Sequence, residues 1–174
     1  RLDCANVLDF GFMKELREKT SSMKPDFWLM GEVIHGEYSR WVNPKMLHSV
    51  TNYELHKAFY SGHNDHNYFE IAHNVRRLEA VGRFLYTFVD NHDEDRIASK
   101  LNNPANLFPV YQLLFTLPGI PSVYYGSEWG IEGKRSRTSD EVLRPALSLS
   151  DMDEKAPELV SHIAALGKIH AEND

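Results

Sequence analysis

Residues 84–93 read FLYTFVDNHD, and this stretch decides how the rest of the chain is interpreted. Its first six residues, Phe84 to Val89, form a mainly apolar run that passes directly into Asp90 to Asp93 without an intervening glycine or proline. A short apolar run of this kind is typical of a buried strand in a parallel sheet. We therefore predict a strand whose carboxyl end delivers the Asn-His-Asp cluster into a solvent-filled cleft.

Two other places repeat this pattern of an apolar strand followed by an acid. The apolar segment Phe27 to Gly31 leads into Glu32, and Leu2 precedes Asp3 in what reads as the last residues of a third strand. Because the carboxyl ends of parallel strands meet at one edge of the sheet, the three acids are expected to converge there. Taken singly, each acid is explained equally well as a helix cap or a solvated loop residue.

Helical and strand patterns alternate along the whole chain. Asp9 can cap a helix that buries Phe12, Met13 and Leu16 and fades at residues 20–22. We expect further strands at 27–31, 50–53, 84–89 and 122–125, a helical turn opened by Pro44, and helices with apolar residues spaced over 71–81, 107–114 and 159–169. Alternation of this type predicts right-handed βαβ units and a parallel α/β sheet. About four strands plus the stub at residues 1–3 amount to roughly half of a closed eight-stranded barrel of about 250 residues.

Composition limits the class of protein. The chain has 174 residues, is 42% hydrophobic and carries a net charge of −6, which suits one domain with its own core. The absence of a Lys/Arg stripe argues against nucleic acid or an anionic membrane as a partner, and the apolar runs are too short to cross a bilayer. Cys4 is the only cysteine, so no internal disulfide can form and the redox compartment stays open, with a cytoplasmic location favoured. Because the chain starts without Met in apparent mid-strand, we expect it to be a piece of a longer protein.

The chemistry suggested by converging carboxylates is hydrolysis of a glycosidic bond. That reaction uses one ionised carboxylate as nucleophile and one protonated carboxyl group as general acid. Arg1 projects to the same side as Asp3 by the two-residue period of a strand, and its guanidinium would hold Asp3 ionised.

Four segments resemble the motif regions of one enzyme family. Residues 1–6 (RLDCAN), 31–33 (GEV) and 88–93 (FVDNHD) resemble the second, third and fourth motif regions of the α-amylase family of glycoside hydrolases, family thirteen, in the family's order. Residues 117–128 (LPGIPSVYYGSE) resemble the family's segment at the eighth barrel strand. The resemblance covers nearly the whole chain. It implies a (β/α)8 TIM-type barrel, of which residues 1–174 would form the partial catalytic domain from the end of strand four to helix eight, with no complete second domain.

The same resemblance implies retaining hydrolysis or transfer at α-glucosidic bonds. By motif position, Asp3 matches the nucleophile, Glu32 the general acid/base, and Asp93 the acid that binds sugar hydroxyls and stabilises the transition state. Arg1 matches the arginine beside the nucleophile, and His92 the histidine that contacts the sugar in the cleavage subsite.

Details of the motifs favour one branch of the family. The pattern Arg-Leu-Asp-x-Ala-Asn is closer to the cyclomaltodextrinase and neopullulanase branch, and His35 also fits that branch. Asn6 and Val7 stand where typical α-amylases have Lys-His, so the substrate-binding lysine and the calcium-linked histidine of those enzymes are missing. Ile34 occupies a place where the branch usually has an aromatic residue. We expect Asn6 and His35 to contact substrate, no cofactor to be required, and no metal site, since this segment gives no support for calcium.

Other candidates have a simpler alternative each. Trp41, Tyr60 and Tyr68 could stack on sugar rings or serve in ordinary packing. The segment 63–66 (HNDH) has a spacing that could ligate a metal, but it is better explained as a solvated loop. We expect the Tyr124-Tyr125 pair in the core and Cys4 as a packed thiol.

With what the resemblance implies, these observations predict a glycoside hydrolase that acts on α-1,4 bonds, with α-1,6 bonds as an open alternative, in maltooligosaccharides or α-glucans. Expected partners are the oligosaccharide or α-glucan substrate, the N-terminal half of the barrel, and a second copy of the chain. One rival is a metal-dependent hydrolase, which would need a His-x-His pair at a strand end that the sequence lacks. The other is a catalytically inactive half-barrel that binds carbohydrate or a partner.

Overall fold

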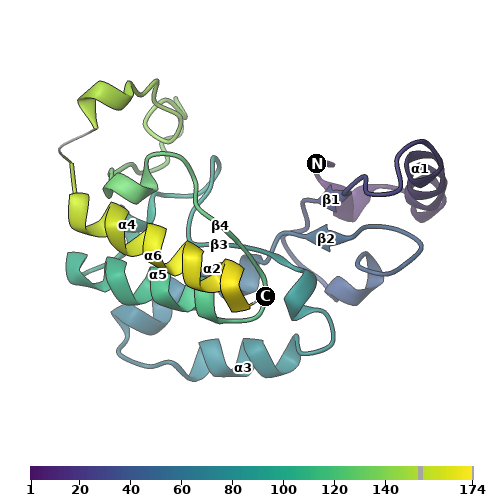
Figure 1. Cartoon of the computed structure of the whole chain (residues 1–174), viewed down its shortest axis with the longest axis horizontal. Coiled ribbons are helices and arrows are strands. Elements are labelled where there is room, and N and C mark those ends of the chain that lie inside the picture. Colours follow the sequence, from purple (N-terminus) through teal and green to yellow (C-terminus); the bar gives the residue numbers. More distant parts are fainter. Residues whose placement is uncertain (153–154, 174) are drawn as a thin grey trace.

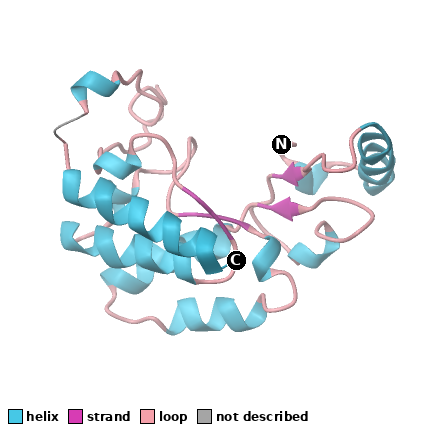
Figure 2. Cartoon of the chain, in the orientation of Figure 1, coloured by secondary structure: helices cyan, strands magenta, loops and turns pink. Residues whose placement is uncertain are grey.

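Short parallel strands and longer helices alternate in the computed structural model, which describes residues 1–152 and 155–173. Figures 1 and 2 show that the strands are a small part of the chain and that most of the regular structure is helical. The strands are β1 (Met30–Gly31), β2 (Ser49–Val50), β3 (Tyr86–Phe88) and β4 (Ile120–Ser122). The helices are α1 (Phe10–Met23), α2 (Tyr53–Asn64), α3 (Phe69–Arg77), α4 (Ile97–Lys100), α5 (Leu107–Thr116) and α6 (Pro157–Asn173).

The strands lie side by side in the order of the sequence. β1 pairs in parallel with β2, and β3 pairs in parallel with β4. Isolated parallel bridges join Leu2 to Gly31 and Thr51 to Tyr86, so the N-terminal stub, β1, β2, β3 and β4 form one succession of neighbours. This confirms the predicted parallel α/β arrangement. All the carboxyl ends of these strands therefore point the same way.

Two apolar cores hold the strands and helices together. The first core lies around α1, β1 and β2 and includes Met13, Leu29 and Leu47. The second core lies between β3 and the helices α2, α5 and α6 and includes Phe59 and Val110. Figure 1 shows the corresponding division, with α1, β1 and β2 on one side of the picture and the larger group of helices beside β3 and β4 on the other.

Helix α1 begins where the sequence indicated. The Asp9 carboxylate accepts a hydrogen bond from the backbone N–H of Phe12 at 2.9 Å, which satisfies one of the free donors of the first turn. Met13 is fully buried, but the expectation that Phe12 also lies on the inner face is wrong, because its side chain is about half exposed.

The predicted strand boundaries were too generous. Residues 27–29 precede β1 and Phe84 belongs to a 3-10 turn at Gly82–Phe84, so only the ends of the two apolar runs pair with neighbouring strands. The predicted strand at 50–53 ends at Val50, because the Asn52 side chain accepts a hydrogen bond from the backbone N–H of Leu55 and starts α2 at Tyr53. No helix begins at Pro44; the turn in this segment is a 3-10 turn at Tyr38–Arg40 instead.

Three expectations about single side chains are also corrected. His63, predicted in a solvated loop, is buried at the end of α2, where its ring Nδ1 lies 2.7 Å from the carbonyl oxygen of Phe59. The Tyr124-Tyr125 pair follows β4 rather than continuing it, and Tyr125 is exposed. The Cys4 thiol is exposed rather than packed, and its backbone adopts a left-handed conformation with φ of 45°.

None of the helices in the described part of the chain combines the length and the apolar composition that crossing a bilayer requires.

Candidate active site

The three predicted acids all follow strands at the same edge of the sheet. Glu32 comes directly after β1, and Asp3 comes directly after Leu2, which is bridged to Gly31 of β1. Asp93 lies in the loop after β3. The position of these acids follows from the parallel topology, because the carboxyl ends of parallel strands meet at one edge of the sheet.

Arg1 links the first two acids. Its Nη1 lies 2.7 Å from Oδ1 of Asp3, and its Nη2 lies 2.8 Å from Oε1 of Glu32. The two carboxylates differ strongly in their surroundings: the Asp3 side chain is 76% exposed, whereas that of Glu32 is 9% exposed. One open and one buried carboxylate beside a shared guanidinium form an arrangement in which the two acids can take different tasks.

Asp93 is held by two basic residues. Its Oδ2 lies 3.2 Å from Nε2 of His92, and its Oδ1 lies 2.7 Å from Nη2 of Arg144. Arg144 also donates from Nε to the backbone oxygen of His92 at 3.1 Å, so it binds one side-chain group and one backbone group of the loop after β3. His92 in turn lies 3.5 Å from Nη2 of Arg1, which joins the Asp93 group to the Asp3 and Glu32 group.

Two residues of this site were missed from the sequence. Arg144 comes 51 residues after Asp93 in an irregular polar segment, and nothing in its local pattern indicates the contact. The hydroxyl of Tyr53 lies 3.4 Å from Oε1 of Glu32 and accepts a hydrogen bond from Asn91. Tyr53 is the first residue of α2, three residues after β2 ends at Val50, so the predicted strand over 50–53 placed it inside the sheet rather than at the edge of the site.

The electrostatics at Tyr53 keep its hydroxyl protonated. Burial raises the pKa of Tyr53 to about 12, and the neighbouring carboxylates of Glu32, Glu94 and Asp93 act in the same direction, while the hydrogen bond from Asn91 opposes them. A phenol with this pKa is a hydrogen-bond donor throughout the neutral range.

Within the described residues, Glu32, His92 and Asp93 form one cluster of side chains of metal-ligand type, with one ligand atom of each within 4.8 Å of the others. The guanidinium of Arg1 pairs with Glu32 and approaches His92 in the same space. A fixed positive charge there opposes binding of a second cation, so we interpret the cluster as a set of acid and base groups rather than a metal centre.

The remaining predicted substrate-binding residues do not share one environment. Asn6, in a 3-10 turn at Ala5–Val7, and His35 are exposed, and within the described part of the chain neither side chain makes a hydrogen bond or ion pair with the three acids. Trp41 is only 4% exposed and packs edge-on against Phe10 in the first core. It therefore has no free face for a sugar ring, and the packing alternative is what the structure shows.

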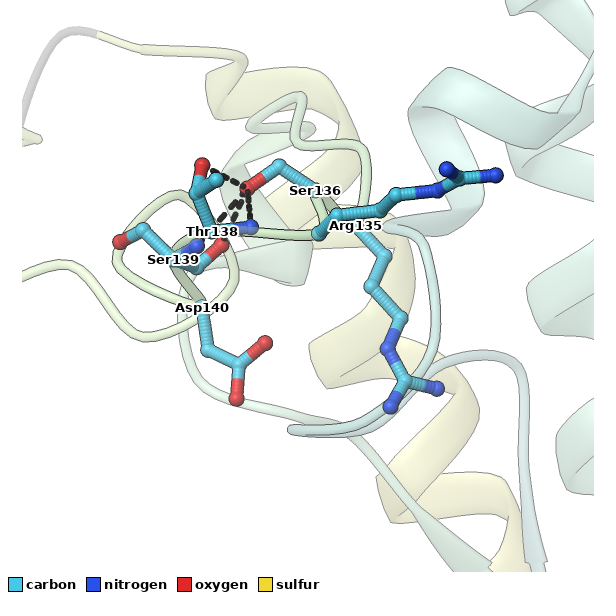
Figure 3. A pocket seen from close by; sticks show the side chains of 6 residues that line it. Arg135, Ser136, Thr138, Ser139 and Asp140 are labelled. Atoms are coloured by element: carbon cyan, nitrogen blue, oxygen red, sulfur yellow. Dashed lines mark hydrogen bonds between the residues drawn. The ribbon is translucent and has the colours of Figure 1, made fainter.

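A polar pocket of about 680 Å³ lies in the loop that precedes Arg144. It is lined by residues 135–140, and Figure 3 shows the Ser136 hydroxyl at the centre of its contacts with Thr138 and Ser139. The backbone N–H of Ser139 donates to Ser136 at 2.9 Å, and the loop is tied to the strand-end region by a hydrogen bond from Arg135 N–H to Asp95 at 2.6 Å. The three acids do not line this pocket.

The family of the chain follows from its match to a known catalytic domain. The family described as "Alpha amylase, catalytic domain" matches residues 6–162, and the chain belongs to this family. The resemblance stated from the motifs is thereby confirmed.

Individual relatives agree with the branch that the motifs favoured. The chain is 27% identical over 181 residues to a maltogenic alpha-amylase of Bacillus acidopullulyticus, covering 99% of this chain and 30% of the relative. It is 32% identical over 143 residues to a cyclomaltodextrinase of Thermoanaerobacter pseudethanolicus, covering 76% of this chain and 24% of that protein. A crystal structure of an Anoxybacillus alpha-amylase superimposes with a TM-score of 0.84 and 25% identity, covering 99% of this chain and 39% of that one.

The chain thus spans about a quarter to two fifths of the length of the proteins it matches. The likeness in structure supports a partial barrel of the α-amylase type, in line with the parallel strand order described above.

Proposed function

We propose that the protein containing residues 1–174 is a retaining glycoside hydrolase that cleaves α-1,4 and also α-1,6 glucosidic bonds in maltooligosaccharides or α-glucans. In this proposal the chain supplies the barrel from the end of strand four to helix eight. The Leu2 stub, β1, β2, β3 and β4 then correspond to strands four to eight, and the N-terminal half of the barrel is the partner that completes the sheet.

The observation that carries the proposal is the bridge that Arg1 makes between Asp3 and Glu32. Retaining hydrolysis needs two carboxyl groups about 5–5.5 Å apart, and two carboxylates that share one guanidinium can meet that requirement. Asp3, which is open to solvent and paired with Arg1, suits attack on the sugar as an ionised nucleophile. Glu32, which is buried, suits transfer of a proton to the leaving oxygen and removal of one from water.

Asp93 and His92 would bind the sugar between these two acids. Their side chains reach the same space as Glu32, and Arg144 fixes the Asp93 carboxylate from the side away from His92. In this assignment a carboxylate held in one orientation accepts hydrogen bonds from sugar hydroxyls and stabilises positive charge in the oxocarbenium-like transition state. The chemistry needs no cofactor, because two carboxyl groups supply both the nucleophile and the proton.

Single substitutions in the protein as its gene encodes it test the assignment. Asp3→Ala and Glu32→Gln should each lower the rate of maltotriose hydrolysis at least about 10²-fold, since acid/base assistance alone contributes about 10²- to 10⁴-fold. Asp26→Asn, which changes an exposed carboxylate elsewhere, serves as the control and should leave the rate unchanged. Circular dichroism of all variants checks that the fold is intact.

The stereochemistry gives a second, independent readout. NMR of the first product released by the wild-type protein should show the α-anomer, as double displacement requires. Release of the β-anomer, or turnover like wild type in Asp3→Ala or Glu32→Gln, would contradict the proposal.

A further inference from the structure

The helix cap and ring packing hold the Tyr53 ring at the first turn of α2, independently of the hydrogen bonds of its hydroxyl. Asn52 caps the helix through its hydrogen bond from the N–H of Leu55, which sets the direction of the first turn. The ring then packs edge-on against Phe88, with centroids 5.0 Å apart, and edge-on against His56 at 6.2 Å. With 9% of its surface exposed, Tyr53 has no space for another rotamer without displacing Phe88 or His56.

Asn91 determines which way the Tyr53 hydroxyl hydrogen points. The Asn91 side-chain oxygen accepts a hydrogen bond from the backbone N–H of Asp93 at 2.9 Å, so its amide nitrogen must face the other way. That nitrogen donates to the Tyr53 oxygen at 3.0 Å. A phenol has a single hydrogen, and with its oxygen accepting from Asn91 this hydrogen is free for Oε1 of Glu32 at 3.4 Å.

We propose that Tyr53, oriented by Asn91, is a positioning residue that donates a hydrogen bond to Glu32 and thereby sets the orientation and the protonation equilibrium of this acid. The inference rests on the function proposed above, in which Glu32 is the acid/base. Tyr53 acts through Glu32 and not on the sugar.

The effect of the Tyr53–Glu32 hydrogen bond depends on the other groups that face Glu32 from each neighbouring element. Arg1 lies 2.8 Å from Oε1, and the backbone N–H of Cys4 lies 3.5 Å from Oε2. His92 and Asp93 approach from the loop after β3, and the Tyr53 hydroxyl approaches from α2, with Glu94 also near Tyr53. Arg1 and Tyr53 share Oε1, so removal of the tyrosine hydroxyl leaves Arg1 in place and withdraws one of the donors that favour the ionised form of Glu32.

The expected shift has a definite sign. A donor to a carboxylate favours the charged form, so loss of the hydroxyl in Tyr53→Phe should favour the protonated form of Glu32. The basic limb of the kcat/KM profile should therefore move to higher pH, because the protonated acid persists further up the pH scale. We expect kcat to fall about 10-fold with KM little changed, since the glutamate is less well oriented while the sugar contacts are unaffected.

The experiment uses the full-length protein and has two readouts. Carbon-13 NMR of labelled glutamate carboxyl groups, with Glu32→Gln to identify the signal, gives the Glu32 pKa without any need for activity. The rate profile with maltotriose gives the functional consequence. Tyr111→Phe is the matched control, because it removes a tyrosine hydroxyl that is buried in the second core and faces Ser127 rather than Glu32.

A second variant keeps the test independent of folding. Incorporation of 3-fluorotyrosine at position 53 preserves the shape of the ring but gives a more acidic phenol, which is a stronger donor. It should lower the Glu32 pKa, opposite to Tyr53→Phe. An unchanged Glu32 pKa in both variants would overturn the inference and leave the proposed function standing, whereas a wild-type protein without hydrolytic activity would overturn the proposed function alone.

Discussion

Two acids that follow the same strand have opposite surroundings. Asp93 is partly exposed and held by His92 and Arg144, whereas Asp90, three residues earlier, is 1% exposed. Oδ2 of Asp90 accepts hydrogen bonds from the N–H of Ile97 and from the Ser127 hydroxyl, each at 2.8 Å, and burial raises its pKa. The comparison shows that one loop provides both a buried anchor and a partly exposed acid.

Arg96 extends the buried anchor, and we call Asp90, Arg96 and Ser127 the buried network. Its guanidinium is fully buried and donates to Ser127 Oγ at 2.9 Å and to the carbonyl oxygens of Tyr125 at 2.6 Å and Leu143 at 2.8 Å. Leu143 immediately precedes Arg144, which reaches Asp93. The buried network therefore fixes the backbone from which an exposed arginine orients a site residue, and the two regions differ in role while they remain connected.

The sharpest way to test this division is to break the buried network. Arg96→Ala removes the donor to three acceptors, of which Ser127 Oγ and the Leu143 carbonyl oxygen lie in buried hydrogen bonds, and each buried acceptor left without a partner costs about 1–3 kcal/mol. We expect the free energy of unfolding to fall by about 3 kcal/mol or more, measured by urea denaturation. Arg137→Ala, at an exposed arginine of the same chain region, is the control and should change stability by less than about 0.5 kcal/mol. Equal effects of the two substitutions would show that burial does not separate the regions.

A second test concerns Glu94, which lies between the exposed and the buried surroundings. The His56 ring, whose Nε2 lies 3.6 Å from Oε2, and the hydrogen bond that Lys100 donates at 2.7 Å lower the pKa of Glu94 from 4.5 to about 2. A lowered folded-state pKa stabilises the protein above pH 4.5, and this contribution is lost as the pH falls towards 2. Because the side chain is 31% exposed, screening reduces the contribution to about 2 kcal/mol.

Glu94→Gln should remove this pH-dependent contribution. We expect the variant to lose about 2 kcal/mol less stability than wild type between pH 4.5 and pH 2, measured by urea denaturation at several pH values. Glu79→Gln, at an exposed glutamate, provides the control and should follow the wild-type curve. Parallel curves for wild type and Glu94→Gln would mean that the pairing of Glu94 with His56 and Lys100 does not stabilise the folded state.

The smallest expected effect is at Arg144, on the exposed side of the comparison. Its side chain is 46% exposed, and ion pairs at such positions contribute about 0–1 kcal/mol, so Arg144→Ala should leave the free energy of unfolding almost unchanged. Under the proposed function, loss of the bond to Asp93 should lower kcat/KM for maltotriose about 10-fold. Arg135→Ala, on the same loop, should leave kcat/KM unchanged. A large loss of stability in Arg144→Ala would place this residue with the buried network instead.

The sequence by itself determined the parallel α/β class, the helix start at Asp9 and the positions of Asp3, Glu32 and Asp93. These features are local: an apolar run that stops at an acid needs no knowledge of distant residues, and the strand order then carries the acids to one edge. Tyr53 was not predicted as a site residue, because the Asn52 cap ends the strand earlier than the predicted range of 50–53.

Only the tertiary structure decided which distant groups meet. The bond from Arg144 to Asp93 and the contacts of Arg96 with Ser127 and Leu143 join residues 31 to 51 positions apart, and no periodicity encodes such pairs. The structure also decided that Trp41 belongs to the first core. The sequence left this open, because an aromatic residue on a loop shows the same sequence pattern whether its ring packs inward or faces a ligand. Burial of a side chain depends on which distant residues pack against it, and the packing of the two cores determines those neighbours.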